Sequence, residues 1–400
     1  MMSAEAAPIM LVAGEASGDL HGATLCRALR TLAPARPLLG MGGERMAGAG
    51  LERLADVTGK AAVGGTEALG PVPALIGAWR RLRAALDGPR RPAALVLIDF
   101  PEFNVRLARV ARRAGIPVVY FIPPQVWAWR PWRARAVARR TSLVLAVFPF
   151  EAALYRRVGA RVEFVGHPVL DAVADAPDRD EARRRLGIEP GATVVALLPG
   201  SRKQEIEGTL PVLHAAAGRI AATRPGAGFL MAAVKRAAEG GDPAAGLRGA
   251  EPPVHVVTGD TYAVMRAADL LLVNSGTATL EAAVLGTPMV VCYRLSRLTE
   301  AMVRLLVRVP WISLANITLG RAVVPELYQR SFTPERVAAE ALRLLDSPAA
   351  LQAQRAAFTE LSTVLGERGV GLRAARHVLS LIEDGAGNPR AGLAHPVRGS

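Results

Sequence analysis

Short apolar segments alternate with stretches of helical periodicity along most of this chain. In the first half the apolar segments predict strands at 9–13, 38–41, 95–99, 118–122, 143–147 and 162–165. In the second half they predict strands at 194–198, 229–233, 255–257, 270–274 and 289–292. Helical patterns such as 21–32 and 105–114 lie between them. This alternation predicts an α/β fold with parallel sheets covered by helices on both faces.

The predicted strands are too many for one Rossmann sheet and divide into two groups. Residues 167–192 lack an apolar strand and are rich in Asp, Pro and Gly, as is typical of a junction. We therefore predict two Rossmann-like parallel-sheet domains facing across a cleft, residues 1–170 and 171–384. The last helices are expected to pack back on the first domain or on a partner. Residues 385–400 predict a disordered tail. A (β/α)₈ barrel is the alternative architecture.

Composition limits the class of protein. The chain has 400 residues and 51% hydrophobic content, enough for two domains with their own cores. It has no 18-residue uncharged apolar run, which argues against a transmembrane helix. The N-terminus lacks a basic region and runs directly into a strand, which argues against a secretory signal. Cys26 and Cys292 lie far apart and predict buried free thiols in a reducing compartment.

The charge balance is strongly basic. The chain has 49 Lys and Arg residues against 35 Asp and Glu residues, a net charge of +14. Such an excess favours nucleic acid, an anionic membrane face or phosphorylated substrates as partners. Residues 60–86 combine apolar side chains with Trp79 and a basic run, and residues 295–309 predict an amphipathic basic helix. Both are candidate membrane contacts, and packing in the core is the alternative for the first.

The segment 273–290 predicts a nucleotide site. A buried strand is followed by a Ser-Gly-Thr turn and a short helix. The free N–H groups of such a helix start suit a diphosphate, and the helix dipole favours its charge. A carboxylate one turn further on can accept hydrogen bonds from ribose hydroxyls. The alternative is an ordinary helix cap with a solvated carboxylate. The predicted nucleotide-binding residues here are Ser275, Gly276, Thr277, Thr279 and Glu281.

Two further patterns concern phosphate and metal. A Pro-Gly-Ser loop and Arg202 follow the strand at 194–198, so Arg202 is a candidate for a bidentate phosphate contact. Asp178 and Asp180 match a DxD metal pattern literally. With Glu181 three residues after Asp178, the same residues fit a helix capping box. We predict no metal ligands and no cofactor.

Carboxylates follow two strands of the first domain. Asp99 ends an apolar run at a sheet edge, where partial desolvation raises a carboxylate pKa and suits a general base. The alternative is an N-cap for the next helix. The loop after the first strand carries Glu15, Asp19 and His21, and we take Glu15 and His21 as rival acid/base groups. A tight turn in which Asp19 caps a helix is the alternative there.

Polar and aromatic side chains at other loops predict the rest of the cleft. Residues 123–133 contain three of the five tryptophans among arginines. This segment can form an acceptor wall, stack nucleic-acid bases or pack as an aromatic cluster. The loop from 310 to 329 carries Asn316 and other hydrogen-bonding residues between apolar anchors. The predicted acceptor or cleft residues are Ser17, Asn104, Gln125, Trp127, Glu326 and Gln329.

These segments, in order from about residue 9 to 330, resemble one family, the lipid-A-disaccharide synthases. The matching pieces are AGEASGDLHGA, GMGGERM, LIDFPEFN, PPQVWAWR, VGHPVLD, LLPGSRKQEI, NSGTATLEAAVLGTPMVV and SLANITLGRAVVPELYQ. The family is a group of GT-B glycosyltransferases of Gram-negative bacteria. The resemblance implies an inverting, metal-independent transfer from UDP-2,3-diacylglucosamine to 2,3-diacylglucosamine 1-phosphate (lipid X). The products are a β-1,6 disaccharide 1-phosphate and UDP, formed at the cytoplasmic face of the inner membrane.

The resemblance also implies roles for particular positions. Asp99 would be essential and a candidate base, and the first domain would take the acceptor. Arg202, Asn316, Glu281 and the turn at 275–279 would hold UDP in the second domain. The resemblance further implies a homodimer that exchanges C-terminal segments. One departure is at 64–71, where glycines and a proline stand in a stretch that is often more apolar in relatives.

Two other functions are compatible with the same patterns. One is a different UDP-sugar enzyme of GT-B fold, such as a polyprenyl-linked glycosyltransferase or a UDP-sugar 2-epimerase. The other is a non-catalytic basic protein that binds nucleic acid through the Trp/Arg stretch. Binding to UDP and to a DNA duplex distinguishes them, because nucleic-acid binding falls steeply with salt. We predict UDP-sugar and acylated glucosamine phosphate as partners, and no nucleic acid.

Overall fold

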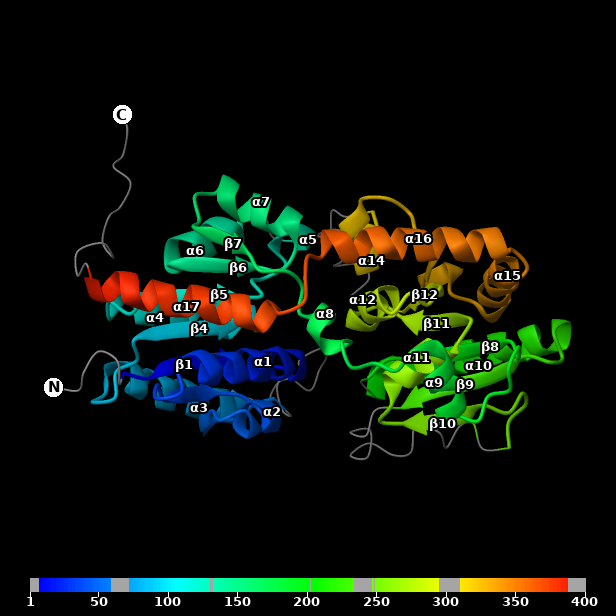
Figure 1. Cartoon of the computed structure of the whole chain (residues 1–400), viewed down its shortest axis with the longest axis horizontal. Helices are drawn as coiled ribbons and strands as arrows, with labels where there is room; N and C mark the ends of the chain where they lie inside the picture. The colour runs from blue at the N-terminus through cyan, green and yellow to red at the C-terminus, as the bar shows by residue number, and fades with distance from the viewer. Residues whose placement is uncertain are drawn as a thin grey trace. The chain divides into compact units, whose positions relative to one another are not determined.

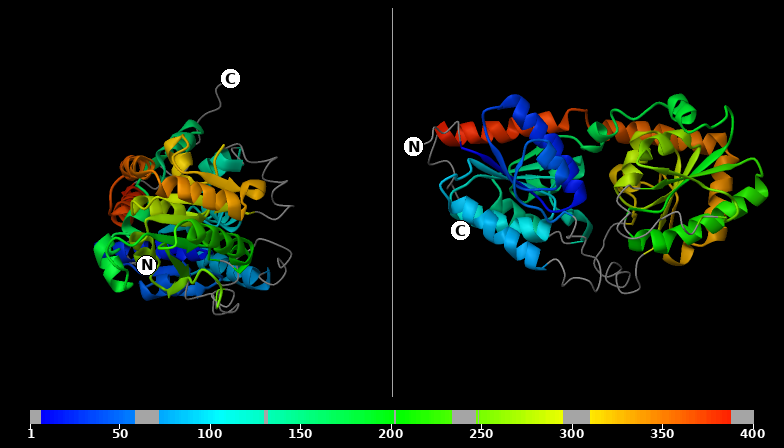
Figure 2. Two further views of the ribbon diagram at one scale, coloured as in Figure 1. Left: turned by 90° about the vertical axis from the view of Figure 1, so that its right-hand side faces the viewer. Right: turned by 90° about the horizontal axis from the view of Figure 1, so that it is seen from below.

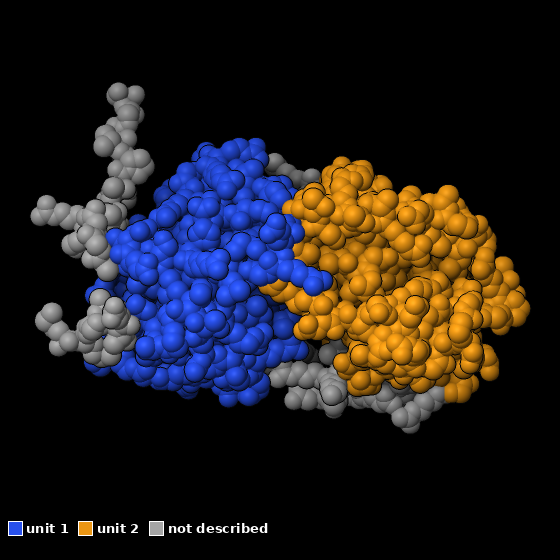
Figure 3. All heavy atoms as spheres, in the orientation of Figure 1, with its two compact units in different colours: residues 1–168, 366–400 blue, residues 169–365 orange. Residues whose placement is uncertain are grey.

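The computed structural model describes residues 7–58, 72–129, 132–201, 203–233, 247, 249–294 and 310–387. The chain divides into two compact units, residues 1–168 together with 366–400, and residues 169–365 (Figure 3). Each unit contains one sheet in which all strand pairs with a described register are parallel (Figure 1). The prediction of two parallel-sheet α/β domains is therefore confirmed, and the single-barrel alternative is wrong.

The first sheet has the strand order β3-β2-β1-β4-β5-β6-β7. Its strands are β1 (Ile9–Ala13), β2 (Leu38–Met41), β3 (Glu52–Ala55), β4 (Ala94–Ile98), β5 (Val118–Phe121), β6 (Leu143–Ala146) and β7 (Val162–Phe164). Two edge strands were not predicted: β3 exposes Glu52 and Arg53 and lacks an apolar run, and β13 (Glu326–Tyr328) of the second sheet lies within residues 310–329, which were predicted as a loop. The strand order reverses between β1 and β4, so ligands are expected beyond the carboxyl ends of these two strands.

Helices cover both faces of this sheet (Figure 2). On one face α1 (Ala16–Leu32) packs against α17 (Val370–Gly387), which returns from the end of the chain. The other face is covered by α3 (Val72–Asp87), α4 (Pro101–Arg113), α6 (Arg133–Arg140) and α7 (Pro149–Arg157). Short helices α2 (Glu44–Gly48) and α5 (Val126–Trp129) complete the unit.

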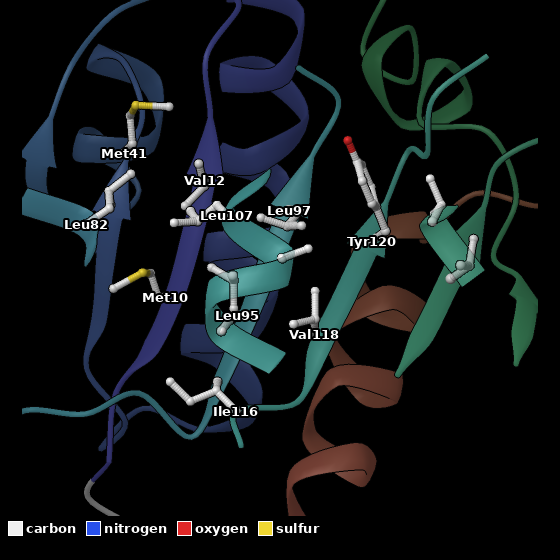
Figure 4. Close-up of a cluster of buried hydrophobic side chains, with 14 of the residues drawn as sticks. Met10, Val12, Met41, Leu82, Leu95, Leu97, Leu107, Ile116, Val118 and Tyr120 are labelled. Carbon is white, nitrogen blue, oxygen red and sulfur yellow. The ribbon is translucent and has the colours of Figure 1, made fainter. Parts of the chain in front are cut away.

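One hydrophobic core of the first unit lies between the sheet and the helices α3, α4, α6 and α7. Alternate side chains of the central strands, such as Met10, Val12, Leu95 and Leu97, are fully buried there, together with Leu107 of α4 (Figure 4). Strands buried on both faces read as continuous apolar runs in the sequence, which is why β1 and β4 could be predicted.

The second sheet has the order β10-β9-β8-β11-β12-β13 and reverses between β8 and β11. Its strands are β8 (Val194–Leu198), β9 (Gly228–Ala233), β10 (His255–Thr258), β11 (Leu270–Asn274), β12 (Met289–Tyr293) and β13 (Glu326–Tyr328). Its helices are α8 (Val169–Ala172), α9 (Arg179–Arg185), α10 (Lys203–Thr223), α11 (Thr261–Ala267), α12 (Thr277–Val284), α14 (Leu314–Leu319), α15 (Pro334–Leu345) and α16 (Pro348–Val364), and Gln329–Ser331 forms a 3-10 turn.

Several predictions about single residues can be checked in these elements. The Asp178 carboxylate accepts a hydrogen bond from the Glu181 backbone N–H at 2.8 Å, so it caps α9 as expected. No group of three or more potential metal ligands occurs within the described ranges. Cys26 and Cys292 are buried and free. Among the residues that the structure describes, no helix is long and apolar enough to cross a membrane.

Candidate active site and nucleotide site

Asp99 lies at a sharp corner between β4 and α4. It is followed by Phe100, which is the N-cap residue of α4 and has no side-chain cap. Asp99 has a φ of 47° and Phe100 has a φ of 48°, so two consecutive non-glycine residues occupy the left-handed region. The corner turns the chain directly beyond the carboxyl end of β4. Asp99 is thus not the cap of the helix, and its carboxylate remains at the sheet edge.

The environment of Asp99 suits a proton acceptor. The pKa of its carboxyl is raised from 3.8 to about 6, mainly by burial and also by the nearby Glu15 carboxylate, while a hydrogen bond from the Phe100 backbone N–H acts in the opposite direction. A pKa close to the working pH is the optimum for general base catalysis, because the group is ionised and still basic. Glu15 is the N-cap residue of α1 and is half-buried. The structure therefore brings these two carboxylates together.

Asp19 and His21 have other surroundings. The Asp19 carboxylate accepts hydrogen bonds from the backbone N–H groups of Gly43 at 2.7 Å and Met46 at 3.1 Å. It therefore ties α1 to the start of α2. Burial lowers the pKa of His21 to about 4, and the positive charge of Arg45 contributes. His21 is a neutral imidazole at pH 7 and a weaker proton acceptor than Asp99. Ser17 is exposed in the first turn of α1.

Trp127 belongs to an aromatic cluster. Its ring meets Phe150 edge to face with centroids 5.1 Å apart, and Phe150 stacks on Phe148 at 5.1 Å. Phe148 in turn packs against His167 at 4.8 Å. The indole is only partly buried, so both the packing and the acceptor interpretation apply to it. Gln125, two residues earlier, is exposed.

Glu151 is a buried carboxyl that the sequence analysis missed. It lies in the first turn of α7, is 1% exposed and accepts a hydrogen bond from the Val147 backbone N–H at 3.3 Å. Burial raises its pKa to about 8, and the negative charge of Asp99 contributes. It is therefore protonated at neutral pH. The only feature of the sequence that could have indicated this residue is a glutamate three residues after Phe148, at the start of a helix. That pattern is typical of an ordinary helix cap and does not predict a buried carboxyl.

The described part of the nucleotide site lies at the start of α12. Gly276 is the N-cap residue and no side chain caps the helix. Two of the predicted hydroxyls are engaged within the protein: Ser275 Oγ donates to the Ile312 carbonyl at 3.1 Å, and the fully buried Thr279 donates to the Gly276 carbonyl at 2.8 Å. Thr277 is exposed. The backbone N–H groups of Ser275 and Thr279 donate to the carbonyls of Cys292 and Gly276, both at 3.1 Å, which leaves those of Gly276, Thr277 and Ala278 as candidate donors for a diphosphate.

Glu281 lies one turn inside α12 and is half-buried. Burial raises the pKa of its carboxyl, and a hydrogen bond from Tyr262 opposes this increase. The Tyr262 hydroxyl donates to Glu281 Oε1 at 3.1 Å. The structure therefore adds Tyr262 of α11 to the predicted set. Nothing in the sequence pairs Tyr262 with Glu281, because the contact is made between neighbouring helices.

Asn316 and Glu326 are hydrogen-bonded within the protein, so they do not make the direct ligand contacts that were predicted for them. Asn316 is fully buried and its Nδ2 donates to Glu326 Oε1 at 2.8 Å and to the Val324 carbonyl at 2.9 Å. Glu326 also accepts from the backbone N–H groups of Ile312 and Ser313, both at 2.9 Å. Both side chains thus stabilise the loop whose Ile312 carbonyl accepts the hydrogen bond from the Ser275 hydroxyl. Gln329 has a φ of 53° in the 3-10 turn after β13.

Asn104 also differs from its predicted place in the cleft. It is 0% exposed, and its amide group donates to backbone carbonyls at the ends of β1 and β4. A side chain in this position acts through the backbone that it contacts.

Some predicted residues lie outside the described ranges. They are Arg202, residues 60–71 of the first candidate membrane segment, the whole of 295–309, and the predicted tail from 388 onward. Immediately before Arg202, the Ser201 backbone N–H donates to Glu205 Oε2 at 3.0 Å. Asn274, at the end of β11, lies beside the same loop, since a Cβ on Gly200 would be 2.9 Å from its Nδ2. The loops after β8 and β11 therefore meet.

Comparison with solved structures defines the class of fold. The fold is similar to a putative UDP-N-acetylglucosamine 2-epimerase from Listeria monocytogenes, with a TM-score of 0.64, 13% identity, and 95% of this chain and 97% of that chain covered. It is also similar to the glycosyltransferase of kitacinnamycin, with a TM-score of 0.62, 18% identity, and coverage of 94% and 99%. The chain thus has the GT-B fold of glycosyltransferases and UDP-sugar epimerases.

Comparison of sequences narrows this class to one family. The family model described as lipid-A-disaccharide synthetase matches residues 9–371. A lipid-A-disaccharide synthase of Geobacter sulfurreducens is 42% identical over 374 residues, covering 94% of this chain and 97% of that protein. One of Anaeromyxobacter dehalogenans is 44% identical over 384 residues, with the same coverage. The chain belongs to the lipid-A-disaccharide synthetase family, which confirms the resemblance.

Proposed function

We propose that this protein condenses UDP-2,3-diacylglucosamine with 2,3-diacylglucosamine 1-phosphate, giving a lipid A disaccharide 1-phosphate and UDP. The observation that carries the proposal is the family match across residues 9–371 together with relatives of one name at 42% and 44% identity. The two carboxylates at the end of β4 and the start of α1, and the uncapped start of α12, are compatible with such a transfer.

In the proposed reaction, the Asp99 carboxylate takes the proton from the acceptor 6-hydroxyl. The resulting oxygen nucleophile attacks the anomeric carbon of the donor from the face opposite UDP. A new glycosidic C–O bond forms as the bond to the diphosphate breaks, and UDP leaves with the electron pair. The raised pKa of Asp99 supports this role, because a carboxyl with a pKa of about 6 is both ionised at neutral pH and more basic than an ordinary aspartate. Glu15 and His21 are its rivals.

For the donor, we propose that the backbone N–H groups of Gly276, Thr277 and Ala278, within the turn at 275–279, bind the diphosphate. They can stabilise the charge that grows on it during bond cleavage, since fixed donors at a helix N-terminus need no reorganisation. Arg202 adds a charged contact in this proposal. Glu281, oriented by Tyr262 at 3.1 Å, binds the ribose hydroxyls. Asn316 and Glu326 act indirectly, by holding the loop beside Ser275.

For the acceptor, we propose that Ser17, Gln125 and Trp127 line its site in the first unit. Ser17 and Gln125 are exposed, and the Trp127 indole is partly so. An indole offers an apolar face to a sugar ring or an acyl chain. Glu326 and Gln329 belong to the second unit, so we assign them to the donor side.

We also propose that the first unit binds an anionic membrane surface through a basic face on α3, α4 and α6. Burial lowers the pKa of Arg140, and the positive charges of Arg109, Arg139 and Arg133 nearby contribute to the decrease. Exposed apolar side chains, among them Ile76 at 48% and Trp132 at 63%, lie on the same helices or directly before them. The exposed arginines of the face are Arg80, Arg81, Arg83, Arg106, Arg109, Arg112, Arg113, Arg135 and Arg139.

This membrane contact would keep the enzyme at the cytoplasmic face of the inner membrane, where acylated substrates are found. Each basic residue near an anionic surface contributes about 1 kcal/mol. A homodimer with exchanged C-terminal segments is a further proposal. In the single chain α17 packs against α1, and an exchange would form the same contact between two chains.

The experiment that tests the function is a turnover assay with UDP-2,3-diacylglucosamine and 2,3-diacylglucosamine 1-phosphate, in which UDP release and product mass are followed. A disaccharide 1-phosphate is expected. UDP binding without product would retain the fold but contradict the proposed acceptor. Absence of UDP binding would contradict the assignment of the nucleotide site, and interconversion of UDP-sugar epimers would favour the epimerase alternative.

A further inference from the structure

The corner between β4 and α4 needs support from its surroundings. Asp99 and Phe100 have φ values of 47° and 48°, a region that residues with a Cβ seldom adopt. Such conformations persist where the surrounding structure over-determines them, and they gather at functional sites. The side chains that contact this corner are therefore expected to determine the position of the Asp99 carboxylate.

Two buried side chains hold the Asp99 carbonyl. Asn104 Nδ2 donates to it at 2.7 Å, and the Tyr120 hydroxyl donates to it at 2.9 Å. Both side chains are 0% exposed. A carbonyl oxygen has two lone pairs, so this one is saturated by two side-chain donors. Because the carbonyl direction fixes the backbone of Asp99 on one side of its Cα, these bonds also set the direction of its side chain.

Asn104 also contacts backbone groups of β1, β4 and Phe100, which come together at this corner. Its Nδ2 lies 3.3 Å from the carbonyls of Val12, one residue before the end of β1, and Ile98, the last residue of β4. Its backbone N–H donates to the Phe100 carbonyl at 3.0 Å. Its Oδ1, in contrast, is buried without a partner among the described residues. An apolar residue would avoid that unsatisfied acceptor, so the amide N–H₂ group is what this position uses.

The Phe100 ring prevents the corner from relaxing toward the loop after β1. It lies so close to Gly14 that a Cβ there would be 2.3 Å from Phe100 Cδ1. The ring also stacks against Phe103 with centroids 5.5 Å apart. The corner is thus held by hydrogen bonds at the Asp99 carbonyl and by packing at the Phe100 ring.

We propose that Asn104 and Tyr120 are positioning residues for the transfer reaction, which hold the Asp99 carbonyl so that its carboxylate is presented beyond the end of β4. This inference rests on the proposed role of Asp99 as the base. Asn104 and Tyr120 touch no substrate and act through Asp99. Two hydrogen bonds from residues of different elements, one on α4 and one on β5, give the carboxylate a single direction.

The test compares two single-hydroxyl deletions in the same core. Tyr120→Phe removes the bond to the Asp99 carbonyl. Tyr155→Phe is the matched control, since the Tyr155 hydroxyl is also buried and donates to the Pro124 carbonyl at 3.0 Å. Steady-state kinetics with both substrates give kcat, KM and the pH profile of kcat/KM. Urea unfolding gives the stability of each variant.

Tyr120→Phe is expected to lower kcat about tenfold, equivalent to ~1.4 kcal/mol in the barrier, with the KM for the UDP-sugar unchanged. Asn104→Ala is expected to lower kcat on the order of a hundredfold, the usual effect of a misplaced reacting group. A loosened corner admits water, so the acidic limb of the pH profile should move to lower pH. The carboxyls of Glu15 on α1 and Glu151 on α7, which also act on Asp99, are present in both variants.

Tyr155→Phe should lose comparable stability and keep the wild-type pH profile. If Tyr120→Phe and Asn104→Ala fold and retain wild-type kcat and pH profile, the positioning role is refuted. Equal losses of kcat in Tyr120→Phe and Tyr155→Phe would assign the effect to the core in general and also overturn it. Full activity of Asp99→Asn would instead refute the proposed base, so the two failures are distinguishable.

Discussion

Replacing Asp99 by Asn should make the protein more stable and nearly inactive at neutral pH. The substitution keeps the shape of the side chain, and Asn is among the residues that best tolerate the left-handed conformation found there. It removes the charge. Loss of a general base typically costs a hundredfold to ten-thousandfold in rate, so kcat is expected to fall by about this factor. UDP affinity should be unchanged, because the nucleotide site belongs to the other unit.

The stability gain follows from the pKa of the same carboxyl. Its pKa rises from 3.8 in the unfolded chain to about 6 in the folded protein, with burial as the main cause. One pKa unit corresponds to about 1.4 kcal/mol, so the ionised carboxylate costs the folded state up to ~3 kcal/mol. Below about pH 4 the carboxyl is protonated in both states and there is no cost. Between about pH 4 and 6 the folded state keeps a proton that the unfolded chain releases, so wild-type stability falls as the pH rises.

The assay is urea unfolding of the wild type and Asp99→Asn at about pH 8 and about pH 3. We expect the variant to be more stable by ~2–3 kcal/mol at the higher pH and equal at the lower one. Glu189→Gln, at an exposed carboxyl, is the control. A variant that is no more stable at about pH 8 would refute the assigned pKa. Turnover above about a tenth of the wild-type value would refute Asp99 as the base.

Three further predictions concern other parts of the chain. Glu281→Gln should weaken UDP binding about tenfold to a hundredfold in calorimetry, since hydrogen bonds to a charged group are worth ~1.5–3 kcal/mol, and unchanged affinity would remove Glu281 from the site. Asn316→Ala should lower the free energy of unfolding by ~2–4 kcal/mol because it strands the buried backbone N–H groups of Val323 and Val324. A loss below about 0.5 kcal/mol would contradict this network. Arg109→Glu with Arg112→Glu should reduce sedimentation with phosphatidylglycerol vesicles at least tenfold, at about 1 kcal/mol per charge. Arg27→Glu with Arg376→Glu, the same charge change on the opposite face, should have little effect, and equal losses would argue against the basic face.

The sequence determined the positions of the strands and of the loops that follow them. Buried parallel strands such as β1 and β11 read as continuous apolar runs, and Gly, Ser and acidic residues follow them directly. The Asp178 cap of α9 was also readable, because both partners lie within one helical turn. The edge strands β3 and β13 were missed, since β3 begins with two exposed charged residues and β13 has only three residues, none of them fully buried.

The tertiary structure alone decided what the polar side chains of these loops do. Asn104 and Asn316 are indistinguishable from surface residues in the sequence, yet both are fully buried and bonded to backbone groups. The same holds for Glu151, whose pKa of about 8 results from burial beneath residues of other elements. The pairing of Tyr262 with Glu281 joins two helices across 19 positions of the chain.

The physical reason for this division is the range of the interactions involved. Strand and helix signals come from the local pattern of apolar residues and from caps, which the chain carries within a few residues. The burial of a polar group, its pKa and its hydrogen-bond partner depend on segments that meet only after the sheet has formed. The return of α17 to α1 from the far end of the chain is of this second kind, since it depends on complementary surfaces that no local pattern records.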